Sequence, residues 1–161
     1  MRVLIVRHAI AVEHGTPGIP DEERPLTPEG ERRFRRAARG LARLTRRPDV
    51  LFSSPLPRAR RTAEIAARAW GRVAVTDAPA LVAGELDEVA RLLEEHREAR
   101  LVALVGHEPS LSAILARLLG SRDGGRLTFR KGGAALVDLP GPLSEGGQLV
   151  WFLPPRVLRQ L

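Results

Sequence analysis

The sequence has 161 residues, 43% of them hydrophobic, which is the usual size of one domain and enough to bury a core. We therefore expect a single globular domain over residues 1–161. The sequence contains no cysteine, which excludes disulfides, thiolate metal sites and cysteine nucleophiles. The formal net charge of +7 raises the question of a polyanionic partner such as nucleic acid.

Arginine supplies almost all of the positive charge, because Lys131 is the only lysine. Many arginines fall in the stretch GERRFRRAARGLARLTRR at residues 30–47, where apolar residues at helical spacing leave the arginines on the opposite, solvated face. The sequence has no tyrosine and few other aromatic residues, so it lacks the stacking surfaces of single-strand binders. We therefore expect no nucleic-acid partner.

The first apolar run ends at the pair Arg7 and His8. It is too short for the core of a signal peptide and far too short to span a membrane. The sequence therefore predicts a cytoplasmic protein with no membrane contact.

Short β-branched or aliphatic runs alternate with helical patterns along the chain. Six predicted strands cover Arg2–Val6, Val50–Ser53, Val73–Val75, Leu101–Gly106, Ala134–Leu139 and Leu149–Phe152. Four predicted helices cover Thr27–Arg46, Pro57–Trp70, Glu85–His96 and Pro109–Leu119. This alternation requires crossover connections and predicts an α/β fold with three α/β/α layers and a mostly parallel central sheet of about six strands. The last two strands lack a helix between them and are candidates for antiparallel pairing.

The first helix has a well-marked start. Thr27 is the expected N-cap, Pro28 occupies the first helical position, and Gly30 is tolerated early in the helix. The stretch Ile10–Leu26 before it is long, irregular and rich in glycine and proline. A loop of this length inside a compact domain is usually functional.

Polar residues follow three of the predicted strands. Arg7 and His8 follow the first strand, Arg58 opens the helix after the second, and the GHEP block at 106–109 follows the fourth. Ligands of parallel sheets bind beyond the carboxyl ends of the strands. Each residue alone has a structural explanation, such as a solvent-facing strand end for Arg7 or a helix cap for His107. Their convergence at one edge favours a phosphate site, because arginine forks and imidazoles suit phosphate oxygens.

These residues stand in blocks that resemble a known family. The blocks RH at 7–8, SSPLPRA at 53–59, TAE at 62–64 and GH at 106–107 are similar to the motifs of the histidine phosphatase superfamily, which has the phosphoglycerate mutase-like fold. Two further blocks, RPLTPEG at 24–30 and VGHEP at 105–109, resemble the phosphohistidine phosphatase SixA family more narrowly. The resemblance runs in order from residue 1 to about residue 120. One mild departure is Ala9, where the family commonly has glycine.

The resemblance implies covalent phosphoryl transfer that needs no metal or other cofactor. His8, neutral and with one ring nitrogen free, would attack phosphorus and become a phosphohistidine, which water would then hydrolyse. Arg7 and Arg58 would hold the phosphate oxygens, and His107 would donate a further hydrogen bond. Arg24 would join them if the long loop folds over the site; the alternative is an exposed loop arginine.

A proton donor is missing from the family pattern. Many members of the superfamily place a glutamate after the third strand, and the corresponding position here is Ala83. An alcohol leaving group needs such an acid. Glu85, Asp87 and Glu88 lie nearby, but acids are favoured in the first turn of a helix without a catalytic role. SixA-like members share this lack, and a phosphorus–nitrogen bond to imidazole breaks readily once the nitrogen is protonated. The resemblance therefore implies a protein phosphohistidine, carried by a signalling protein, as substrate.

Three other functions stay open at this stage. The nearest is the same chemistry on a small phosphorylated metabolite. A non-catalytic phosphate or nucleic-acid binding module is more distant and is supported by the arginine excess. A phosphoglycerate mutase is disfavoured because the short chain leaves little room for insertions that close over such a substrate. The sequence does not specify the oligomeric state.

A metal centre made of His8, Glu13, His14 and His107 is also disfavoured. The spacing of these residues fits no helix-borne ligand motif, and a neighbouring arginine would repel the cation. His14 and His96 are expected to be structural or solvated.

Overall fold

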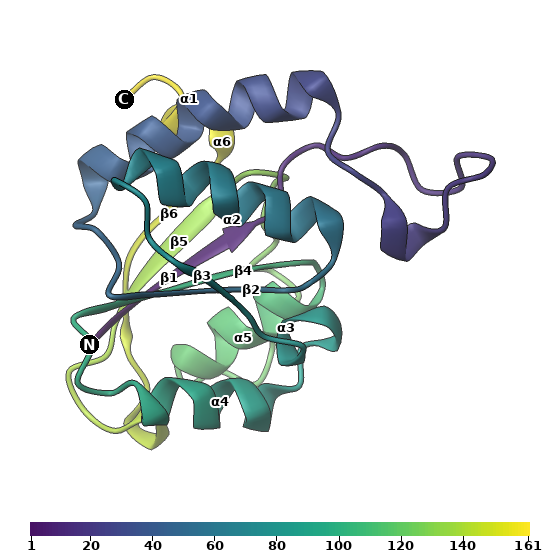
Figure 1. The fold of residues 1–161 in the computed structure, drawn as a ribbon. Helices are drawn as coiled ribbons and strands as arrows, with labels where there is room; N and C mark the ends of the chain where they lie inside the picture. Colours follow the sequence, from purple (N-terminus) through teal and green to yellow (C-terminus); the bar gives the residue numbers. More distant parts are fainter.

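Two layers of helices enclose a six-stranded sheet (Figure 1). The computed structural model describes residues 1–161. The strands are β1 (Arg2–Arg7), β2 (Val50–Ser53), β3 (Val75–Asp77), β4 (Leu101–Gly106), β5 (Ala134–Asp138) and β6 (Gln148–Leu153). The helices are α1 (Pro28–Leu44), α2 (Pro57–Ala69), α3 (Ala80–Ala83), α4 (Leu86–Glu95), α5 (Ser110–Leu118) and α6 (Pro155–Leu158), with short 3-10 helices η1 (Asp21–Glu23) and η2 (Leu143–Glu145). None of the helices is both long and apolar enough to cross a bilayer.

The strands lie in the order β3-β2-β4-β1-β5-β6. The first four of these are parallel, because a helix connects each strand to the next along the chain. β5 runs antiparallel to both β1 and β6, in the part of the sequence without a helical pattern. The predicted mostly parallel α/β fold is therefore confirmed. This strand order places the carboxyl ends of β2, β4 and β1 side by side.

Both faces of the sheet are buried. In Figure 1, helices α1, α2 and α6 cover one face and helices α3, α4 and α5 cover the other. Along β1, Leu4 and Val6 join the core cluster on the first side, while Val3 and Ile5 join the cluster on the second. All four side chains are fully buried, as expected of a strand covered on both faces. Packing from both sides therefore fixes the strand that leads to Arg7.

Close contacts fix the base of the N-terminal loop. Thr27 caps α1 as predicted, because its hydroxyl accepts the Gly30 N–H at 2.9 Å. Glycine is required at position 30, since a Cβ there would lie 2.0 Å from the Ile10 carbonyl oxygen. A β-bridge between Ala11 and Leu26 closes the loop, which extends well beyond the end of β1 (Figure 1).

The structure differs from the predicted elements in one strand position and in two short helices. The third strand covers Val75–Asp77 instead of the predicted Val73–Val75, because Gly71 and Arg72 both adopt positive φ (80° and 68°) and turn the chain just before it. The one-turn helices α3 and α6 were not predicted. Four residues are too few to show helical periodicity in a sequence.

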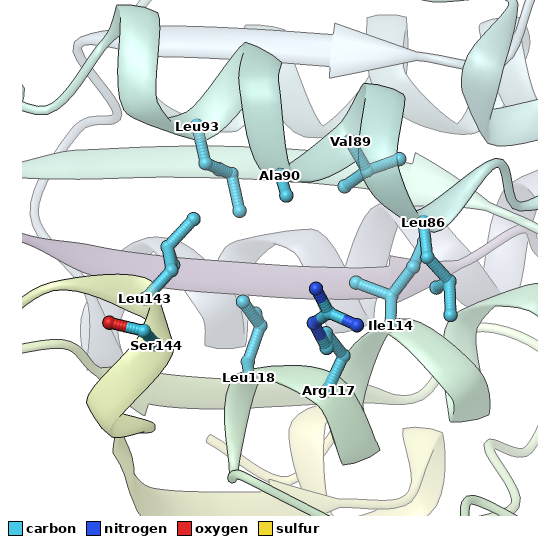
Figure 2. Close-up of a pocket in the computed structure, with 9 residues that line it drawn as sticks. All are labelled: Leu86, Val89, Ala90, Leu93, Ile114, Arg117, Leu118, Leu143 and Ser144. Carbon is cyan, nitrogen blue, oxygen red and sulfur yellow. The ribbon is translucent and has the colours of Figure 1, made fainter. Parts of the chain in front are cut away.

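An apolar groove of about 120 Å³ lies between α4 and α5 (Figure 2). Its lining includes Val89, Leu93, Ile114 and Leu118, with Arg117 beside them. The four apolar side chains are almost completely buried, so the groove is a narrow gap where the apolar faces of the two helices pack together. It shares no residue with the strand ends described below.

Candidate active site

Adjacent strands deliver three of the candidate residues to one edge of the sheet. β1 ends at Arg7, followed by His8, and β4 ends at Gly106, followed by His107. The His8 N–H donates to the Gly106 carbonyl oxygen at 3.0 Å. The rings of His8 and His107 lie close together, with centroids 5.1 Å apart. Two of the three strand ends that carry candidate residues in the sequence, those of β1 and β4, therefore lie side by side.

The His8 ring is buried, with 4% of the residue exposed. Its Nδ1 lies 2.7 Å from the Ala9 carbonyl oxygen, so Nδ1 carries the proton and donates this bond. Nε2 therefore keeps its lone pair. Burial lowers the pKa of His8 to about 3, against the opposing effect of the Ala9 bond, and the charges of His107, Arg58 and Arg7 contribute. His8 is thus neutral at pH 7, which is the state a nucleophilic imidazole requires.

His107 is equally enclosed, with 6% of the residue exposed. Its Nε2 lies 2.8 Å from the hydroxyl of Ser54, the residue that follows β2. Burial lowers the pKa of His107 to about 4, and repulsion by Arg58 adds to this effect. Ser54 belongs to the SSPLPRA block, but its spacing in the sequence did not connect it to His107.

Arg7 is held by the main chain of the segment before β5. Its Nη1 donates to the Phe129 carbonyl oxygen at 2.6 Å. The Phe129 N–H donates in turn to the Glu108 carboxylate at 2.6 Å, which also accepts bonds from the backbone and hydroxyl of Ser112. Burial lowers the pKa of Arg7, and the negative charge of Glu108 opposes this. Sequence reasoning missed both supporting residues, and the position of Glu108 next to His107 was the only available signal.

Arg58 lies in the first turn of α2 and is 5% exposed. Its Nη1 donates to the backbone carbonyl oxygen of Asp21 at 2.7 Å, and its Nη2 lies 3.3 Å from the Asp21 carboxylate. Burial lowers the pKa of Arg58, and repulsion by Arg24 adds to this. Asp21 belongs to the long loop, so this part of the loop folds back onto the start of α2. Nothing in the sequence pattern had singled out Asp21.

Arg24 lies in the same part of the loop. Its Nε donates to the Asp21 carboxylate at 2.8 Å and its Nη1 to the Val12 carbonyl oxygen at 2.7 Å. Only 11% of its side chain is exposed, so it is not the exposed loop arginine of the alternative prediction. Arg24 and Arg58 thus share the Asp21 carboxylate, and the charge of Arg24 helps burial to lower the pKa of both Arg58 and His107.

Thr62 connects the turn after His8 to the helix that carries Arg58. Its hydroxyl accepts the Ala9 N–H at 3.0 Å and donates to the Arg58 carbonyl oxygen at 2.7 Å. The side chain is fully buried. In the sequence, Thr62 stands in the TAE block at 62–64, and nothing in that block predicts this link. One hydroxyl therefore fixes two parts of the site relative to each other.

The site contains polar atoms suited to an anion. Buried side-chain nitrogens without a hydrogen-bond partner are Nε of Arg7, Nε of Arg58, Nδ1 of His107 and, outside the site, Nε1 of Trp70. Buried polar groups are normally paired, and an unpaired one costs free energy. Two arginine forks and a third guanidinium nearby, that of Arg24, favour a ligand with several negatively charged oxygens, such as phosphate.

The acidic residues near Ala83 stay outside the site. Glu85, Asp87 and Glu88 are exposed, and none forms a hydrogen bond or ion pair with a candidate site residue. Asp87 lies 3.8 Å from Arg117. The structure therefore shows no contact between these three carboxylates and the candidate site residues.

The remaining histidines lie apart from His8 and His107. His14 is exposed and bonds Asp21 at 2.7 Å, which lowers the pKa of that carboxyl to about 2, with Arg24 contributing. Nδ1 of His96 lies 2.8 Å from the Leu92 carbonyl oxygen. No group of three or more His, Asp or Glu side chains is placed to hold a metal ion. The structure thus does not assemble the alternative metal centre.

Comparison with known proteins identifies the family. A family model described as the histidine phosphatase superfamily (branch 1) matches residues 3–88, which is more than half of the chain. The chain therefore belongs to the histidine phosphatase superfamily, and it is a phosphatase that acts through a histidine.

Individual relatives show which members of the superfamily the chain resembles. An uncharacterized protein from Picosynechococcus sp. is 34% identical over 137 residues, which cover 83% of this chain and 82% of that protein. A crystal structure described as a proposed phosphohistidine phosphatase SixA from Agrobacterium tumefaciens is 27% identical with a TM-score of 0.79, covering 96% of this chain and 98% of that one. The protein histidine phosphatase SixA complexed with tungstate is 24% identical with a TM-score of 0.83, covering 98% and 99%. The chain is SixA-like, and the predicted phosphoglycerate mutase-like fold is confirmed.

Proposed function

We propose that the chain hydrolyses protein phosphohistidine through a phosphoryl group carried on His8. The observation that supports this most is the state of His8 itself. Its ring is buried and neutral, its Nδ1 is bound to the Ala9 carbonyl oxygen, and its Nε2 is left free beside the ring of His107. The positive charges of Arg7 and Arg58 contribute to lowering its pKa, and the same charges would attract the oxygens of a phosphoryl group attached to it.

The reaction has two displacement steps. In the first, the Nε2 lone pair of His8 attacks phosphorus, so that a phosphorus–nitrogen bond forms to His8 while the bond to the substrate imidazole breaks. The departing nitrogen takes up a proton and leaves as neutral imidazole. In the second step, water attacks phosphorus, the bond to His8 breaks, and inorganic phosphate leaves as the water gives up a proton.

The surrounding cations stabilise the charge that is shared among the phosphoryl oxygens in both steps. Arg7 and Arg58 are permanently protonated and present several N–H donors each. His107 donates a further hydrogen bond from a ring nitrogen, and Arg24 adds positive charge beside Arg58. The bonds from Arg7 to Phe129 and from Arg58 to Asp21 hold these guanidinium groups before substrate binds, which reduces the cost of ordering them.

The leaving group decides between the possible substrates. Phosphate esters of alcohols need a protein acid, and none of Glu85, Asp87 and Glu88 forms a hydrogen bond or ion pair with a residue of this site. The imidazole of a phosphohistidine can take up a proton near neutral pH before the phosphorus–nitrogen bond breaks, whereas the bridging oxygen of an alcohol ester cannot. The likeness to a structure described as a protein histidine phosphatase supports the same substrate class. A signalling protein that carries phosphohistidine is therefore the partner we propose.

Substrate comparison tests this proposal. We expect kcat/KM for a phosphohistidine peptide to exceed that for a phosphoserine peptide or glucose 6-phosphate by roughly 100-fold, the size of a missing acid catalyst's contribution. The His8→Asn variant should be inactive on all three. Equal or faster hydrolysis of glucose 6-phosphate by the wild type would instead assign the enzyme to small phosphorylated metabolites.

A further inference from the structure

A basic groove of about 260 Å³ begins next to the nucleophile. Ala9 and Ile10, which directly follow His8, belong to its lining. The other walls are the first half of α1, residues 130–132 and residues 154–159. The groove therefore adjoins the segment that directly follows His8, on the side of the sheet that α1 and α6 cover.

The lining of this groove is strongly positive. It contains no acidic residue and five basic ones, Arg33, Arg130, Lys131, Arg156 and Arg159. Arg33 pairs with Glu29 on its own helix, but the other four form no ion pair. On α2, by contrast, Arg60 and Arg61 are both paired with neighbouring acids. Like charges this close repel each other, and an anionic ligand would remove that repulsion.

Backbone hydrogen bonds attach the groove to the nucleophile. The Gly132 N–H points to the carbonyl oxygens of both Arg7 and His8, at 3.2 and 3.0 Å. Gly132 has a φ of 79°, in the left-handed region that glycine adopts without strain. This turn presents Arg130 and Lys131 at a fixed position relative to His8. Charges in the groove can therefore contact the part of a substrate that lies next to its phosphoryl group.

We propose that this groove binds an acidic segment of the protein that carries the phosphohistidine, a proposal that rests on the function proposed above. Aspartate or glutamate side chains near the phosphohistidine would pair with Arg130, Lys131, Arg156 and Arg159 while the phosphoryl group lies against His8. Nucleic acid fits the groove less well, because a single-stranded ligand needs aromatic surfaces for stacking. The one aromatic side chain in the lining, Phe34, is 2% exposed.

Charge reversal on α6 and just after it tests the proposal with a matched control. The test variant is Arg156→Glu with Arg159→Glu. The control is Arg39→Glu with Arg68→Glu, which makes the same change in net charge in a separate basic recess between α1 and α2. Arg68 lies ten residues beyond Arg58 on the same helix, about 15 Å along its axis. The substrates are phosphoramidate and two phosphohistidine peptides, one flanked by glutamates and one by glutamines.

The wild type should hydrolyse the glutamate-flanked peptide with a kcat/KM roughly tenfold above that of the glutamine-flanked peptide at low salt, as expected of two or three partly exposed ion pairs. The α6 variant should lose this ratio while it still hydrolyses phosphoramidate, and the control variant should keep it. A ratio near one in the wild type, or the same loss in both variants, would overturn the groove proposal. Stronger inhibition by a DNA oligonucleotide than by the glutamate-rich peptide would also overturn it. If the wild type did not hydrolyse phosphoramidate at all, that result would instead contradict the proposed function.

Discussion

Replacing His8 by asparagine should make the folded protein more tolerant of mild acid. The folded-state pKa of His8 is about 3, below the unfolded value of about 6.5, so its neutral burial contributes stability at neutral pH that is lost as the pH falls from 6.5 towards 3. Between pH 7 and pH 5 the unfolded chain takes up about three quarters of a proton at this residue and the folded chain takes up almost none. This difference removes about 2 kcal/mol from the free energy of unfolding.

His107 behaves in the same way, because its folded-state pKa is about 4. The two histidines together should cost the wild type about 4 kcal/mol between pH 7 and pH 5, and the His8→Asn variant should lose only about half of that. Urea denaturation followed by circular dichroism at pH 5, 6, 7 and 8 measures the change. Between pH 7 and pH 8 both histidines are largely neutral in both states, so the difference in unfolding free energy between the two proteins should change there by only about 0.1 kcal/mol. Parallel curves over the whole pH range would show that His8 is not buried in its neutral form.

Two further substitutions test the groups that hold the arginines. Glu108→Ala removes the carboxylate that holds the Phe129 backbone and, through it, Arg7. The kcat/KM for phosphoramidate should therefore fall roughly 10- to 100-fold, and Glu108→Gln should recover part of this loss. Unchanged kinetics in the alanine variant would exclude this positioning role. Asp21→Asn removes a negative charge beside Arg58 but keeps the backbone carbonyl that Arg58 also binds, so the inhibition constant of inorganic phosphate should fall about fivefold. Weaker inhibition by phosphate in that variant would show that the carboxylate is needed to hold the arginine.

The positions of Arg7, His8 and His107 could be predicted from the sequence because they depend on local signals. Continuous apolar runs mark buried strands, and each run ends at one of these residues. The alternation with helices makes the strands parallel, and parallel strands bring their carboxyl ends to one edge. Arg58 follows from the same logic, since Pro57 marks the first turn of its helix.

The residues that hold Arg58 and Arg7 in place could not be predicted in the same way. Asp21 reaches Arg58 across 37 residues, and the Glu108 carboxylate reaches the Phe129 N–H across 21. Such contacts depend on how an irregular segment folds back onto the domain, and no periodic pattern describes that path. The third strand was misplaced for a related reason. Its position depends on a turn in which Arg72, a residue type with no preference for positive φ, adopts a φ of 68°.

Direct labelling tests the transfer of the phosphoryl group to His8. The wild type is mixed with ³²P-labelled phosphoramidate, denatured in alkali within the first turnovers, digested and analysed by mass spectrometry. The account predicts label on Nε2 of His8 that is stable in base and lost in acid, with no label and no turnover in the His8→Asn variant. Label on another residue, or turnover by the His8→Asn variant, would contradict the account.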